Sequence, residues 1–384
     1  MKKSGFSASS PGSLVEIGKD EVAFIPNPLP PEASSLDSII MELEKAIQSI
    51  GLLQGRGKDL PNPSLLIQPL RTSEALASSR IEGTIADPQE LAVAASQAQE
   101  EKTGFIDDDI LEVLNYRHAM DNAINMLPDM PISDLMIRGI HKQLLNGLSE
   151  ARGAHKNPGE YRKKQCHIGY DKEIRFTPPP ALEVKPAMAH LVEYINQKKP
   201  SAASLVDAAL IHYQFETIHP FDDGNGRVGR ILIPIYLAAR GVLERESPLF
   251  YPSVAIERRR QEYIDRLLEV SRSGDWIGWI RFFLQITWET CEDTLVRVEG
   301  IFSLLEKYKT QFSGKGHTRL PAELAEYLFE KPVVSIGSVK KEFEVTYPTA
   351  KRMIERLVEV KILQEFPHRR KPKLFYAPDI IALS

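Results

Sequence analysis

The stretch HPFDDGNGRVGR, at residues 219–230, decides how the fold and purpose of this chain are interpreted. It combines one histidine, two adjacent aspartates, two glycines around an asparagine, and two arginines, and only Phe221 and Val228 have the character of core residues. A hydrophobic core does not require such a density of polar side chains. The stretch therefore indicates a functional site.

The glycines in this stretch predict a loop that binds an anion. Gly224 and Gly226 can adopt positive φ, and with Asn225 between them they let backbone N–H groups converge on one point. The residues that follow, 226–240, predict a helix, whose N-terminus attracts phosphate through its unpaired N–H groups and its dipole. We expect the Asn225 amide to contact a phosphate oxygen.

Charged residues flank the glycines. Arg227 and Arg230 are three residues apart, so they project on one side of the helix and can fork onto phosphate oxygens. Asp223 is a hard oxygen ligand, which suits Mg²⁺ held mainly by a nucleotide's phosphates and by water. His219 has an ordinary pKa that suits a general base near neutral pH. The stretch thus predicts nucleotide phosphate, a metal ion and a base in one place.

The same residues match the HPFx(D/E)GNGRxxR signature of Fic-domain proteins at every specified position, so the chain resembles that family. The resemblance implies a mostly α-helical fold with a Fic-type core. It also implies transfer of AMP from ATP, with Mg²⁺, to a Ser, Thr or Tyr hydroxyl of a target protein. In that scheme His219 is catalytic and Asp223 holds the metal, and the nucleotide is bound by Gly224, Asn225, Gly226, Arg227 and Arg230.

A second motif lies at the end of a predicted helix over residues 64–81. Gly83 suits a helix C-cap, whereas an acidic Glu82 beside a helix C-terminus is electrostatically unfavourable, so helix formation alone does not require it. Ser78, Glu82 and Gly83 resemble the (S/T)xxxE(G/N) inhibitory motif of Fic proteins. The resemblance implies that Glu82 pairs with Arg230 and excludes the γ-phosphate of ATP, which makes the enzyme autoinhibited.

Hydrophobic periodicity predicts helices through most of the chain. Residues 1–34, which are rich in Ser, Pro and Gly, predict an extended arm. Further helices are expected over 36–53, 87–99, 107–127, 133–148, 181–197, 202–215, 253–271 and 276–312. In the helix over 133–148, we expect Ser133 as N-cap and Leu135, Ile140 and Leu144 facing the core.

Residues 159–180 predict a short β-hairpin. The pattern PGEYR…IG…PPP resembles the flap of Fic proteins, which holds the target segment by strand-like pairing, and an exposed edge strand is suited to accept an extended peptide. A connecting hairpin without substrate contact is the alternative.

The C-terminal part predicts three short helices (321–329, 336–343, 348–360) and two strands (363–366, 373–376) around a basic tip at 368–372. This order resembles a winged helix-turn-helix, with Thr349, Lys351 and Arg352 at the exposed start of the third helix. Such domains bind DNA or protein, or form dimers, and the sequence leaves this open. We expect an N-terminal region at 1–104, the catalytic core with its helical extension at 105–313, and the winged helix at 314–384.

Composition predicts a cytoplasmic protein. The 384 residues carry a net charge of −4, which gives no argument for nucleic acid or an anionic membrane, and Cys166 and Cys291 lack the spacing of a zinc site. We see neither a signal peptide nor a membrane-length apolar stretch. A homodimer is expected by resemblance only. Other readings are removal of AMP, transfer of another phosphate-linked group, or a DNA-binding regulator; the target protein stays open.

Overall fold

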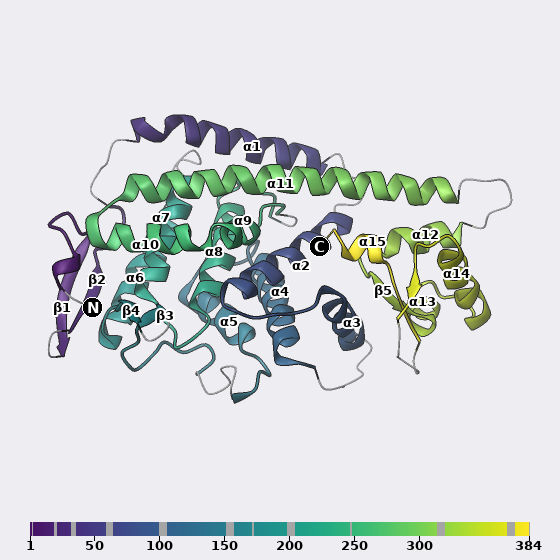
Figure 1. Ribbon diagram of the computed structural model, residues 1–384, viewed down its shortest axis with the longest axis horizontal. Coiled ribbons are helices and arrows are strands. Elements are labelled where there is room, and N and C mark those ends of the chain that lie inside the picture. Colours follow the sequence, from purple (N-terminus) through teal and green to yellow (C-terminus); the bar gives the residue numbers. More distant parts are fainter. Residues whose placement is uncertain are drawn as a thin grey trace.

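The longest helix, α11 (Trp276–Gln311), and α1 (Ile40–Lys58) lie side by side along one edge of the molecule (Figure 1). Ala46, Ile50 and Leu53 are spaced at i, i+4 and i+7, so they form the buried stripe of α1. This computed structural model describes residues 1, 3–18, 21–31, 36–58, 64–99, 106–150, 157–170, 173–197, 204–245, 248–312, 319–366 and 373–383.

The mostly helical fold predicted from the sequence is confirmed. One continuous hydrophobic core joins the helices. Short 3₁₀ turns occur at Lys3–Gly5 and Asp37–Ile39. The helices between α1 and α11 are α2 (Ser64–Ile81), α3 (Pro88–Gln99), α4 (Asp108–Met126), α5 (Asp134–Leu144), α6 (Ala181–Asn196), α7 (Ser204–Ile218), α8 (Asn225–Ala239), α9 (Ser253–Arg258) and α10 (Arg260–Ser273).

Helices α7 and α8 form the centre of this core. Nearly all of their side chains are buried, including polar ones such as Asp207, His212 and Arg230. The signature connects them, because α7 ends at Ile218 and α8 begins at Asn225. The loop is therefore held at both ends by the most buried helices of the protein.

Two predictions about helices were wrong in detail. Leu135 is 70% exposed, because it lies in the first turn of α5 on the solvent side, whereas Ser133 is the N-cap as expected and accepts a bond from the Met136 N–H at 3.2 Å. The predicted helix over 253–271 is two helices, α9 and α10. The break is at Arg259, whose backbone (φ −114°, ψ 30°) leaves the helical region while its guanidinium bonds Glu262 and Glu289.

Two β-hairpins lie near the same end of the molecule (Figure 1). The predicted extended arm is instead paired: β1 (Gly12–Gly18) and β2 (Glu21–Pro26) form an antiparallel hairpin. The predicted hairpin is present as β3 (Ile168–Tyr170) and β4 (Glu173–Phe176). Phe24 of the first hairpin packs against Phe176 of the second, and its N–H donates to Thr177 O at 3.0 Å. The β1–β2 hairpin thus packs against the β3–β4 hairpin and supports it.

The C-terminal part comprises α12 (Leu320–Tyr327), β5 (Val333–Ser335), α13 (Ile336–Glu342), α14 (Tyr347–Glu359), β6 (Gln364–Glu365), β7 (Leu374–Tyr376) and α15 (Pro378–Ile381). Its antiparallel sheet has the order β5-β7-β6, so the helix and strand order of a winged helix is present, with a strand β5 that the sequence reading missed. The basic tip at 368–372 lies outside the described residues. This part packs on α3, where Val93 meets Val333, Leu374 and Ile381.

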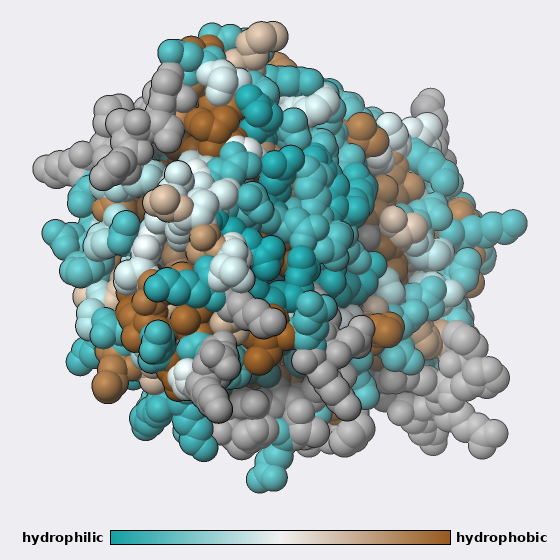
Figure 2. Space-filling view, turned by 60° about the vertical axis from the view of Figure 1, so that its left-hand side comes forward, coloured by the Kyte–Doolittle hydropathy of each residue, from teal (hydrophilic) through white to brown (hydrophobic). Residues whose placement is uncertain are grey.

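On the face shown in Figure 2, hydrophilic side chains cover broad areas and apolar ones gather in smaller patches among them. Such a mixture is ordinary for a folded domain. Within the described ranges, no helix combines the length and the apolar character needed to cross a membrane.

Candidate active site

His219 opens the signature loop (residues 219–226) in a backbone conformation that is uncommon for a non-glycine residue. Its φ is +49°, in the left-handed region. The ring Nδ1 faces the backbone oxygen of Glu216 at 3.3 Å, so Nδ1 carries the proton and Nε2 is left to accept one. Burial disfavours the charged ring and lowers the pKa of His219 to about 4, so the imidazole is neutral at physiological pH.

Arg162 holds this loop in place, a role that the sequence did not reveal. It is 2% exposed, and its guanidinium donates to the backbone oxygens of His219 at 2.8 Å and Pro179 at 2.6 Å. Its own N–H donates to Pro220 O at 2.9 Å. Arg162 therefore ties the end of the β3–β4 segment to the residue that carries the base.

Asn225 shapes the loop from inside. Its Oδ1 accepts from the Phe221 N–H at 2.8 Å, and its Nδ2 donates to Phe221 O at 2.9 Å. The amide oxygen and one amide N–H are thus used within the loop, and the expected contact of the amide with phosphate stays a prediction for the second N–H. Gly224 has φ +73° and precedes the first turn of α8, where no side chain caps the N–H groups. The helix N-terminus is therefore available to an anion.

The loop rests on His141 of α5, as expected for a structural histidine. Its ring stacks on Phe221 with 3.8 Å between centroids. Nδ1 accepts from the Gly159 N–H at 2.9 Å, and Nε2 lies 3.1 Å from Asp223 O. Both ring nitrogens are engaged, and burial lowers the pKa of His141 to about 4, so the ring remains neutral.

Asp223 is the residue in this loop that suits a metal ion. Its side chain is 42% exposed, and Oδ1 accepts from the Gly224 N–H at 2.6 Å. The described residues contain no group of three or more potential ligands, so a protein-only cage is absent from them. One exposed carboxylate fits Mg²⁺ that takes its other ligands from phosphate and water.

Arg227 is buried with unsatisfied N–H groups. Its Nε and Nη1 have no hydrogen-bond partner within the described part of the chain, although Nη1 lies 3.2 Å from Glu112 Oε2. Glu112 also accepts from the Thr84 hydroxyl at 2.5 Å. Unsatisfied donors beside a helix N-terminus indicate a site for acceptor oxygens.

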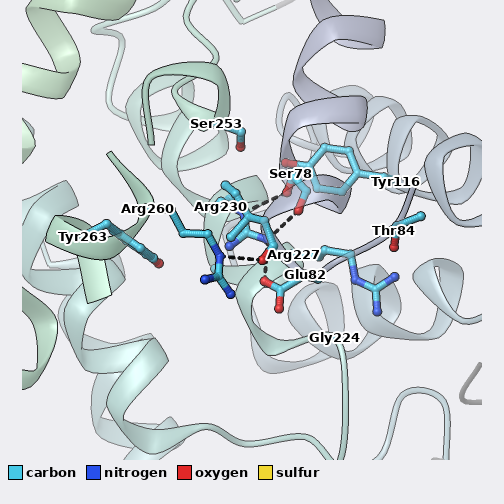
Figure 3. A network of polar contacts seen from close by, with 12 residues as sticks. Ser78, Glu82, Thr84, Tyr116, Gly224, Arg227, Arg230, Ser253, Arg260 and Tyr263 are labelled. Atoms are coloured by element: carbon cyan, nitrogen blue, oxygen red, sulfur yellow. Dashed lines mark hydrogen bonds and ion pairs between the residues drawn. The ribbon is translucent and has the colours of Figure 1, made fainter. Parts of the chain in front are cut away.

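Arg230 joins α8 to the inhibitory segment (residues 78–83), as Figure 3 shows. Its Nε donates to Ser78 Oγ at 2.8 Å, and its Nη2 donates to Ser78 O at 2.9 Å and Glu82 Oε1 at 2.7 Å. Burial opposes its charge, but the Glu82 carboxylate raises the pKa of Arg230 above its ordinary value. Burial likewise opposes the Glu82 carboxylate, and Arg230 nevertheless lowers the pKa of Glu82. The pair is ionised and bonded.

Two further residues fit the inhibitory segment to the signature. A Cβ at Gly226 would lie 2.2 Å from Glu82 Oε1, so the carboxylate approaches this closely only because the residue is glycine. Arg260 of α10 donates through Nε to Ile81 O at 2.9 Å and so satisfies a carbonyl at the end of α2 (Figure 3). Arg260 therefore holds the end of the inhibitory helix.

A cavity of about 160 Å³ borders these groups. His219, Gly226 and Arg230 line one side, and Ile168 and Phe176 of the β3–β4 hairpin line another. Glu82 also lies along it, so the inhibitory carboxylate occupies the space beside the base and the arginine. The structure brings together the residues that the sequence singled out, whereas their catalytic roles stay predictions.

Two family models match the chain. The Fic/DOC family model matches residues 131–237, and the Fic/DOC family N-terminal model matches residues 40–125. The first contains the signature loop and the second contains the inhibitory segment, so each half of the contact between Glu82 and Arg230 falls in a matched region.

Similar proteins include those named protein adenylyltransferase Fic. The one from Aedes aegypti is 31% identical over 155 residues, which are 40% of this chain and 27% of that protein. The one from Drosophila ananassae is 28% identical over 188 residues, 48% of this chain and 34% of that protein. The chain thus spans about a third or less of the length of these relatives.

Solved structures show the same fold. A Fic family protein from Desulfovibrio desulfuricans superposes with a TM-score of 0.55 at 19% identity, over 91% of this chain and 98% of that one. A Fic domain containing signaling protein from Bacteroides thetaiotaomicron gives a TM-score of 0.51 at 17% identity, over 67% and 97%.

Proposed function

Since this chain belongs to the Fic/DOC family, we propose that it is a protein adenylyltransferase that moves AMP from ATP to a Ser, Thr or Tyr hydroxyl of a target protein. The observation that carries the proposal is the neutral His219 beside the uncapped N-terminus of α8. A base and a phosphate site thus share one loop.

The reaction follows from these positions. The target hydroxyl gives its proton to His219 Nε2 while its oxygen attacks the α-phosphorus. The bond from the α-phosphorus to the bridging oxygen breaks, and pyrophosphate leaves. The N-terminus of α8, Arg227 and Arg230 bind the phosphate oxygens and hold the α-phosphate in line, so most of the rate gain comes from positioning and electrostatics. Asp223 would hold Mg²⁺, which would supply charge neutralisation on the phosphates.

In this proposal Glu82 keeps the enzyme inactive. Its carboxylate occupies Arg230, and the γ-phosphate needs the same guanidinium. A carboxylate and a phosphate cannot share this buried site without strong repulsion. We assign regulation to residues 1–104 and catalysis to residues 105–313. We assign no role in the reaction to the winged-helix part at residues 314–384.

The test compares four forms of the full chain: wild type, Glu82→Gly, His219→Ala and the double variant. Each is incubated with ATP labelled at the α-phosphate or at the γ-phosphate, with and without a cell lysate. We expect Glu82→Gly to attach the α label but not the γ label, and both His219→Ala forms to attach neither. Absence of α label from Glu82→Gly, or full labelling by His219→Ala, would refute the proposal.

Removal of AMP is a second candidate, favoured because Glu82 and His219 lie along the same cavity. A carboxylate there could position a water molecule for attack on a phosphodiester. Incubation of AMPylated protein with wild type, followed by measurement of released AMP, separates the two reactions. DNA binding through α14 stays a prediction; its Lys351 and Arg356 form exposed ion pairs with Glu355 and Glu359.

A further inference from the structure

One carboxyl group beside the cavity has no part in this scheme. Glu216 lies in the last turn of α7, three residues before His219, and its side chain lines the cavity together with Arg230 and Glu82. Its Oε1 is fully buried and has no hydrogen-bond partner within the described residues. A buried acceptor without a partner destabilises the folded state, so its presence indicates a role for this side chain.

The structure makes specific room for this side chain. A Cβ at Gly229 would lie 2.1 Å from Glu216 Oε1, so the carboxyl group rests against the backbone of α8 one residue before Arg230. The charged and titratable groups that face it are Arg230 from α8, Glu82 from α2 and Tyr263 from α10. Of the carboxyl groups near Arg230, Glu82 is bonded to it, Glu216 is not, and Glu74 is bonded to Tyr116 and Ser253 instead.

We infer that Glu216 is a positioning residue that pairs with Arg230 after Glu82 withdraws. It holds the guanidinium in place until the triphosphate arrives, and then takes up a proton and leaves Arg230 to the phosphate. The inference rests on the proposed function only in that ATP requires the withdrawal of Glu82. It assigns Glu216 no contact with the reacting atoms.

The physical reason is the cost of an unpaired buried charge. Arg230 is 1% exposed, and loss of its bonded carboxylate leaves a buried cation that, within the described residues, keeps the neutral partners Ser78 and Tyr263. Two carboxylates beside one arginine repel each other, so only one is ionised at a time. Burial, and then the charge of Glu82, raise the pKa of Glu216 to about 8 against the opposing effect of Arg230, which agrees with a neutral acid while Glu82 is bonded.

A double-variant cycle on the nucleotide-free full chain tests this pairing. We compare the unfolding equilibrium of wild type, Glu82→Gln, Glu216→Gln and the double variant, with Glu193→Gln on the exposed face of α6 as the control. At pH 7, Glu216→Gln should lower the unfolding constant of wild type, because folded Glu216 must keep a proton that the unfolded chain has lost. In the Glu82→Gln background it should raise that constant about tenfold, a coupling typical of contacting residues. Equal effects in both backgrounds would overturn the inference.

A pH series on wild type and the single variants gives a second readout. In wild type, folded Glu216 keeps its proton up to about pH 8 while the unfolded chain loses it near pH 4, so stability falls as pH rises between these values. Between pH 6.5 and 8 the unfolding constant of wild type should rise by at most about tenfold per pH unit. This rise with pH should be weaker in Glu82→Gln and in Glu216→Gln. It should persist in Glu193→Gln. An unchanged dependence in Glu82→Gln would contradict the pairing.

Neither measurement uses nucleotide, so both results stand even if the chain transfers another group. Failure of the proposed function would appear only in the labelling experiment. In a labelling experiment of that kind, the Glu82→Gln, Glu216→Gln double variant should show a higher KM for ATP than Glu82→Gln alone, with a smaller change in kcat. An unchanged KM would also count against Glu216 as a positioning residue.

Discussion

Replacement of Glu82 by glutamine should activate the enzyme, because it removes the charge and keeps the size of the side chain. In the structure Glu82 accepts one hydrogen bond from Arg230, at 2.7 Å, and its side chain is 38% exposed. A hydrogen bond between charged groups contributes about 1.5–3 kcal/mol, and the exposure places this one in the lower half, at about 1.5–2 kcal/mol. Since 1.4 kcal/mol is a factor of ten, the population with Glu82 withdrawn should rise roughly 10–30-fold.

The assay is the initial rate at which α-labelled AMP is attached to the chain itself or to a lysate protein. We expect a rise in rate of the same order, because in the proposed scheme the inhibited state is the ground state of the wild type. Glu90→Gln, an exposed carboxylate in the first turn of α3, is the matched control and should leave the rate unchanged. If Glu82→Gln transfers AMP no faster than wild type while transfer still depends on His219, the inhibitory role of Glu82 is wrong.

Three other predictions concern the groups around this contact. Arg260→Met removes the bond to Ile81 O, so we expect partial activation of about 2–10-fold, from the roughly 0.5–1.5 kcal/mol of one hydrogen bond; no activation would show that α10 does not hold α2. In the Glu82→Gln form, kcat/KM should not change with the charge of His219 above about pH 5, and it should fall as pH drops through about 4, because the base must be neutral. A fall that begins near pH 6.5 would contradict the lowered pKa of the buried His219 ring. Arg162→Lys should lower both thermal stability and kcat, because an ammonium group cannot reproduce the fork onto several carbonyls, with unchanged kcat as the contrary result.

The positions of the central groups could be predicted because local patterns determine them. The signature loop needs glycines before a helix, and the inhibitory segment places an acid where a helix end disfavours one. Their contact is the pairing of Glu82 with Arg230 expected from the family resemblance. What the residues do in catalysis is still a prediction.

The supporting contacts could not be predicted, because they join residues far apart in the chain. Arg162 and Arg260 bond backbone oxygens 57 and 179 residues away. Every residue has a backbone oxygen, so the sequence does not show which one is bonded. The bonds of Asn225 within the loop could not be predicted for the opposite reason, since its partner is only four residues away but depends on the bend of the loop. The β1–β2 hairpin was predicted to be an extended arm, because its contact with Phe176 is a tertiary contact that the local sequence does not show.

Two of the buried arginines of the site, Arg162 and Arg230, differ in what holds them, and this difference determines which can take part in regulation. Arg162 bonds only neutral backbone oxygens, so no change of charge nearby can release it, and it suits a permanent role in fixing His219. Arg230 bonds a carboxylate that is partly exposed and comes from another helix. An incoming phosphate can replace that carboxylate with no net loss of charge pairing at the guanidinium. We therefore propose that regulation acts on Arg230, and that Glu216 pairs with it while the replacement takes place.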